Sequence, residues 1–60
     1  MTEKYLGTHW TVCYSREHKT VEVFHKDRMI FCKVYRRVCD AVDVFASLKT
    51  VSDIKILLDV

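Results

Sequence analysis

Sixty residues allow one small domain, residues 1–60, and a chain of this length buries only about 60% of the surface that it exposes when unfolded. Half of the residues are hydrophobic, there is no proline, and Gly7 is the only glycine, which excludes a disordered tail. The net charge of +2 is too small to imply nucleic acid by itself, and no segment approaches the length of a membrane span.

The compartment follows from the N-terminal residues and the cysteines. The first ten residues, MTEKYLGTHW, contain no apolar run typical of a signal peptide. The cysteines are Cys13, Cys32 and Cys39, an odd number without the spacing of a disulfide framework. We therefore expect a cytoplasmic protein with free thiols.

Two strands are predicted in the first half of the chain. Residues 6–14 (LGTHWTVCY) and residues 20–26 (TVEVFHK) alternate apolar and polar side chains on either side of a polar break. Leu6, Trp10, Val12 and Tyr14 are expected to share one face of the first strand, and Val21 and Val23 are expected to point together on the second.

Residues 28–37 (RMIFCKVYRR) fit either a strand or a helix. As a strand after a turn at residues 26–28, the segment is rich in β-forming residues, and a later helix then starts with acidic residues in its first turn. As a helix, it begins at Asp27 and continues for some 22 residues, with an apolar arc too broad for one sheet. The strand interpretation is favoured slightly.

The second half of the chain predicts one helix and one further strand. Residues 38–49 (VCDAVDVFASLK) have apolar side chains at the spacing of one helical face. Residues 52–60 (SDIKILLDV) alternate Ile54, Ile56, Leu58 and Val60, as a strand does. The predicted fold class is α+β, a small antiparallel sheet with one helix packed on one face. Its topology is βββαβ, or ββαβ with a long helix.

No constellation of residues predicts chemistry. The histidines and cysteines lack the paired spacing of a structural zinc site, and Cys13 has no elbow or orienting group that marks a nucleophile. There is no glycine-rich phosphate loop, and a chain of this size has little material for a deep cleft. We expect no enzyme, no cofactor and no metal.

The charged residues are distributed unevenly. Residues 1–37 carry eight Lys/Arg against four Asp/Glu, whereas residues 38–60 carry two against four. If residues 28–37 are a strand, an outer sheet face would combine Phe24 and Lys26 with Phe31, Lys33, Tyr35 and Arg37. Aromatic side chains interleaved with cations are typical of platforms that bind RNA or single-stranded DNA. The competing interpretation is that this face packs on a second protomer.

Protein binding is the favoured function. With 50% hydrophobic residues, one small core cannot bury every aromatic side chain, and exposed aromatics beside arginines are typical of interface centres. We expect a non-enzymatic module that forms a homodimer or acts as a stoichiometric inhibitor or regulator of a larger protein. The predicted partner-binding residues are Trp10, Phe24, Phe31, Lys33, Tyr35 and Arg37.

The order of a hairpin, a helix (VCDAVDVFASL) and a final strand (SDIKILLDV) gives the chain a general resemblance to one group of proteins. In length and layout it resembles very small phage-encoded proteins that bind and disable one host factor, such as short antitoxins against host RNase toxins. This resemblance implies a stoichiometric inhibitor with no chemistry of its own, and it transfers no functional residue.

Overall fold

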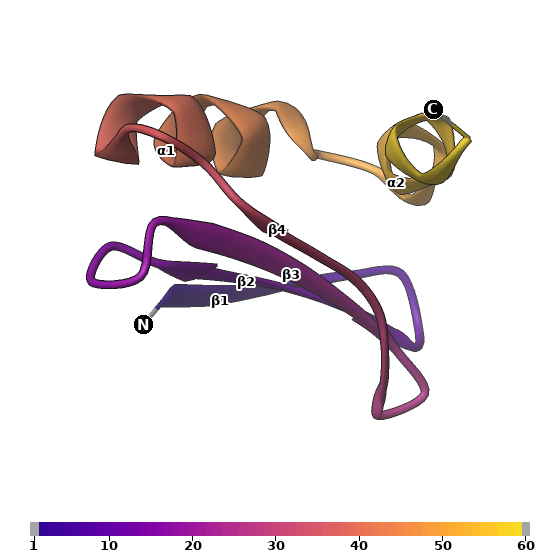
Figure 1. The fold of residues 1–60 in the computed structure, drawn as a ribbon. Helices are drawn as coiled ribbons and strands as arrows, with labels where there is room; N and C mark the ends of the chain where they lie inside the picture. The colour runs from indigo at the N-terminus through magenta and orange to yellow at the C-terminus, as the bar shows by residue number, and fades with distance from the viewer. Residues whose placement is uncertain (1, 60) are drawn as a thin grey trace.

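The computed structural model describes residues 2–59, which form a four-stranded sheet followed by two helices. The strands are β1 (Thr2–Leu6), β2 (Trp10–Ser15), β3 (Thr20–His25) and β4 (Arg28–Val34), and the helices are α1 (Val38–Ser47) and α2 (Val51–Leu58). Each strand pairs antiparallel with the next, in the order β1-β2-β3-β4. Both helices lie on the same side of the sheet (Figure 1). The predicted α+β class is confirmed, but the topology is ββββαα.

The core lies between the sheet and the helices. Val12, Val21 and Val23 are fully buried on the sheet, and the prediction that Val21 and Val23 point to the same face is confirmed. The central cluster is completed by Ala41, Leu48 and Ile54 from the helical half of the chain. Partly buried side chains surround this cluster: Leu6, Trp10, Tyr14, Phe31, Tyr35, Val44, Phe45 and Leu57.

The predicted first strand is in fact the end of β1, a turn and β2. Gly7 has a φ of 66°, a conformation that glycine adopts without steric cost, and the chain reverses there. The strand over residues 2–6 was therefore missed by the sequence analysis. Leu6 pairs with Trp10 across the turn, so the two residues still share a face of the sheet.

Residues 28–34 form a strand, and the long-helix alternative for residues 27–48 is wrong. The turn before β4 consists of Lys26 and Asp27 with φ values of 53° and 65°. Positive φ at both central residues suits the twist of a two-residue hairpin, and Asp is one of the few residues other than glycine that tolerates it. α1 then begins at Val38, as predicted, with Asp40 in its first turn.

The predicted strand at residues 52–60 is wrong, because residues 51–58 form α2; Val60 lies outside the described residues. A capping box starts this helix: the Thr50 hydroxyl accepts from the Asp53 N–H, and the Asp53 carboxylate accepts from the Thr50 N–H. Ile54 and Leu57 pack against the core, whereas Ile56 is left 67% exposed. The alternation of Ile54, Ile56 and Leu58 therefore predicts neither the helical conformation nor which side chains are buried.

Candidate functional site

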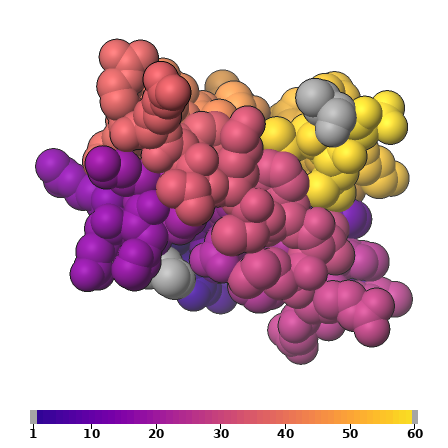
Figure 2. All heavy atoms as spheres, in the orientation of Figure 1, coloured from indigo at the N-terminus to yellow at the C-terminus, as the bar shows by residue number. Residues whose placement is uncertain are grey.

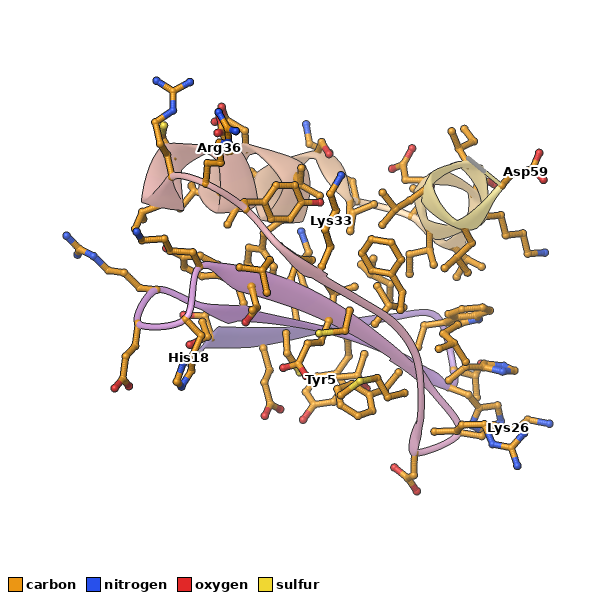
Figure 3. All side chains as sticks on the ribbon, viewed as in Figure 1. Tyr5, His18, Lys26, Lys33, Arg36 and Asp59 are labelled. Carbon is orange, nitrogen blue, oxygen red and sulfur yellow. The ribbon has the colours of Figure 1, made fainter. Side chains whose placement is uncertain are left out.

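The face of the sheet away from the helices is uncovered by any element of residues 2–59 (Figure 1). Strand pairing and alternation assign its residues. This outer face consists of Glu3 and Tyr5 on β1, Thr11, Cys13 and Ser15 on β2, Thr20, Glu22 and Phe24 on β3, and Met29, Cys32 and Val34 on β4. Figure 3 shows Tyr5 on this side of the sheet and Lys33 on the helix side.

The outer face is hollowed along β2. Glu3 and Glu22 pair with Cys13 from either side, and Tyr5 and Phe24 pair with Thr11 in the same way. Small side chains on β2 thus lie between larger ones on β1 and β3. The resulting depression, which we call the outer trough, has a volume of about 380 Å³. It is lined by Glu3, Tyr5, Thr11, Cys13, Glu22, Phe24 and Asp27.

Carboxylates set the electrostatics of the outer trough. The Tyr5 hydroxyl donates to Glu3 Oε2 at 3.2 Å, and this hydrogen bond to the carboxylate raises the pKa of Tyr5. Burial raises the pKa of the Cys13 thiol, and the negative charges of Glu3 and Glu22 raise it further. Cys13, which is only 5% exposed, therefore remains a protonated thiol at neutral pH and a poor nucleophile.

Exposed apolar side chains lie on the outer face, both in the trough and beyond it. Tyr5 is 73% exposed, Val34 is 68% exposed and Met29 is 47% exposed. Cys32, which pairs with Glu22, is also exposed. None of the outer-face residues is a lysine or an arginine. The face therefore combines uncovered apolar side chains with negative charge and no positive charge.

The structure separates the six residues predicted to bind a partner. Only Phe24 lies on the outer face. Phe31 and Tyr35 pack against the core on the helix side, and Lys33 Nζ lies 5.1 Å from the centre of the Tyr35 ring. The other two are Trp10 and Arg37. Trp10 stacks on His25 at 4.2 Å, and Arg37 precedes α1 and pairs with Asp40.

A one-residue irregularity explains this separation. Phe24 pairs with Met29 but Val23 pairs with Phe31, so Ile30 is an extra residue in β4. If the pairing continued from the turn without this bulge, Ile30 would pair with Val23 and Phe31 would pair with Glu22. Phe31 would then lie on the outer face, as the sequence predicted. A one-residue shift moves every following side chain to the other face. The predicted face of Phe24 with Phe31, Lys33 and Tyr35 is therefore wrong.

The cations predicted for the same face lie elsewhere. Figure 3 shows Lys33 and Arg36 on the helix side and Lys26 at the turn between β3 and β4. In Figure 2, side chains of β4 and of the segment that leads to α1 form much of the surface turned to the viewer, so this edge strand is open to solvent.

The sequence analysis missed Glu3, Tyr5, Cys13 and Glu22 as site residues. Glu3 and Tyr5 were overlooked because β1 was not recognised, although the only glycine of the chain, Gly7, marked the turn that ends it. In the sequence, Cys13 and Glu22 belong only to the side of the two predicted strands that carries polar or small residues. Their significance depends on the absence of a helix over that side.

Residues 2–59 contain no cluster of three side chains able to hold a metal ion, and within this range Cys13, Cys32 and Cys39 are free thiols. Neither of the described helices has the length and apolar character needed to cross a bilayer.

The fold and the site define the class of the protein as a small α+β protein with one sheet face covered by helices and the other open. Comparison with protein-family models, with curated proteins and with solved structures gives no match.

Proposed function

We propose that this protein is a small, non-enzymatic protein-binding module whose outer face holds a larger partner protein as a stoichiometric inhibitor or regulator. The observation that carries the proposal is the uncovered outer face with Tyr5 at 73% and Val34 at 68% exposure. Large apolar side chains left exposed on one face are a feature of protein interfaces. The resemblance to small phage-encoded inhibitors implies the same kind of activity.

The size of the sheet indicates how a partner would cover it. Four strands about 4.8 Å apart and about 20 Å long present roughly 400 Å² on one face. A stable interface buries about 800 Å² on each partner. A partner on the outer face would therefore also contact one of the two edge strands, β1 or β4.

Charge favours a different protein over a second copy. Two outer faces packed together would bring Glu3 and Glu22 of both copies into one interface without a cation. The edge of β4 carries Arg28 and Lys33 and no acidic residue, so antiparallel pairing of two β4 strands would bring like charges together. We expect the isolated protein to be monomeric.

RNA or single-stranded DNA binding has less support. The outer face carries two glutamates and no cation, and phosphates are repelled by such a surface. Lys33 and Arg36 lie on the helix side, where Phe31 and Tyr35 are partly buried and offer little ring surface for base stacking. Flat titrations with RNA and single-stranded DNA at low salt are expected; salt-sensitive binding would support nucleic acid instead.

The proposal is tested by affinity capture of partner proteins from cells in which the protein occurs. Capture by the original protein is compared with capture by three single variants. Tyr5→Ser and Val34→Ser change the outer face, whereas Ile56→Ser changes an equally exposed apolar residue on α2. A partner that is lost with the first two variants and retained with Ile56→Ser supports the outer face. Circular dichroism checks that each variant is folded.

Two results would contradict the proposal. A partner lost with Ile56→Ser but retained with both outer-face variants would place binding on the helices. A light-scattering mass of a dimer that falls to a monomer with Tyr5→Ser or Val34→Ser would show that a second copy covers the outer face.

A further inference from the structure

The walls of the outer trough oppose one another across β2 in two rows. Glu3 and Glu22 form the first row on either side of Cys13, and the register places their Cα atoms about 10 Å apart, two strand spacings. Tyr5 and Phe24 form the second row. A side chain that enters the trough between the walls would contact carboxylates and aromatic rings at the same time.

The carboxylates of the trough have no cation of their own. Within residues 2–59 the one ion pair joins Arg37 to Asp40, on the other side of the molecule from the outer face. Glu3, Glu22 and Asp27 line the trough, and none of them forms an ion pair with a described lysine or arginine. A ligand with positive charge would complement this charge.

The aromatic rings narrow the choice of cation. Tyr5 donates to Glu3 at 3.2 Å, which holds the ring beside the carboxylate, and Phe24 lines the trough from the opposite wall. A guanidinium is planar, carries five donors in a fork that matches carboxylates, and stacks on aromatic faces. A metal ion is a poorer fit, because no three ligands converge within the described residues.

We propose that the outer trough receives an arginine side chain of the partner protein, with its guanidinium over Cys13 between Glu3 and Glu22 and against Tyr5 or Phe24. This assignment rests on the proposed function and adds the chemistry of the partner: an apolar surface with an arginine near its centre. The volume of about 380 Å³ is near the lower end of small-ligand sites, roughly 300–1,000 Å³, and suits one side chain.

The test uses the full chain and a capped arginine, N-acetyl-arginine amide, followed by amide chemical shifts in an NMR titration. Saturable shifts are expected at Glu3, Thr11, Cys13 and Glu22, with a dissociation constant on the order of millimolar, as for a single side chain. Capped citrulline has nearly the same shape without the charge, and it should produce no saturable shift. Capped lysine should bind more weakly because it lacks the planar fork.

Charge-removing variants locate the interaction. Glu3→Gln combined with Glu22→Gln is expected to weaken the binding of capped arginine by up to about thirtyfold, since two partly exposed ion pairs are lost. Asp43→Asn combined with Asp59→Asn is the matched control, because it also removes two exposed carboxylates, both in the helical half of the chain, and should leave the affinity unchanged. Equal binding of citrulline, or equal affinity of the double variant, would overturn the proposal.

The outcome can be separated from that of the proposed function. If Tyr5→Ser abolishes partner capture while the double glutamine variant leaves both capture and arginine shifts unchanged, the outer face binds a protein but the trough does not select arginine. If the isolated chain forms oligomers that dissociate in the double variant, the arginine or lysine comes from a second copy, and the assignment to a different protein is wrong.

Discussion

Replacement of Gly7 by alanine tests the docking of α2 on the sheet. Gly7 has a φ of 66°, and a Cβ added there would lie 2.9 Å from Val51 Cγ2, at the start of α2. The same Cβ would lie 3.7 Å from Trp10 Cδ1, an ordinary contact. The substitution therefore introduces one backbone penalty and one steric penalty.

The two penalties can be estimated separately. Left-handed backbone costs a residue with a Cβ roughly 1–2 kcal/mol. Val51 is β-branched and has one strongly preferred rotamer in a helix, so it cannot move aside easily, and overpacking of this kind costs about 1–3 kcal/mol. Gly7→Ala should therefore lower the free energy of unfolding by about 2–5 kcal/mol. A chain of 60 residues has a total of about 3–9 kcal/mol, so the variant is marginally stable.

The assay is urea or thermal unfolding, followed by circular dichroism and by the fluorescence of Trp10. The control is the same substitution in a Val51→Ala background, which removes the atom that the new Cβ would meet. There only the backbone penalty remains, and Gly7→Ala should cost about 1–2 kcal/mol. The difference between the two backgrounds is the coupling energy of Gly7 and Val51.

Equal penalties in both backgrounds would refute the reasoning. They would show that Val51 does not lie against the β1–β2 turn. The strand that the alternation of residues 52–60 suggests would give that result, because it has no reason to bring Val51 to Gly7. A coupling of about 1 kcal/mol or more supports the docked helix.

Four further substitutions test individual contacts. Lys4→Met removes the ammonium group that donates to the Phe45 carbonyl at the end of α1 and lies over the Phe45 ring; a loss of about 1 kcal/mol is expected in urea unfolding, and an unchanged midpoint would contradict this capping role. Thr50→Ala removes the cap of α2 and should cost about 1 kcal/mol. Backbone hydrogen bonds from Lys49 and Thr50 lower the pKa of Asp53, so the stability that Asp53 adds is present above its unfolded pKa and is lost as the pH falls through the folded pKa. Asp53→Asn should remove this part of the dependence of the unfolding free energy on pH. An identical pH profile of the two proteins would argue against this role. Val23→Ala opens space beneath α1 and should cost about 2 kcal/mol, whereas a change below about 0.5 kcal/mol would mean that this valine is not in a packed core.

Local patterns were sufficient for several elements. The β2–β3 hairpin and the burial of Val12, Val21 and Val23 follow from alternation around a polar break, and α1 follows from apolar spacing with Asp40 near its start. These features depend on interactions within a few residues, and periodicity reports them well.

Alternation of apolar residues gave wrong predictions where another local signal, a helix cap or a glycine turn, determined the structure. The alternation of residues 52–60 suggested a strand, but the Thr50 and Asp53 capping box starts a helix there. The signal is present in the sequence, in the order Thr-x-x-Asp before an apolar run. Similarly, Gly7 divides what alternation alone joins into one strand.

By itself the sequence determined the fold class, the alternation of the β2–β3 hairpin and the excess of apolar side chains over what one small core can bury. Only the tertiary structure decided which of those side chains remain outside. The extra residue Ile30 in β4 reverses the faces, so Phe31 and Tyr35 join the core while Phe24 stays outside beside Tyr5. Pairing of a strand with its neighbour, rather than its own alternation, sets the direction of its side chains, and that pairing depends on residues distant in the chain.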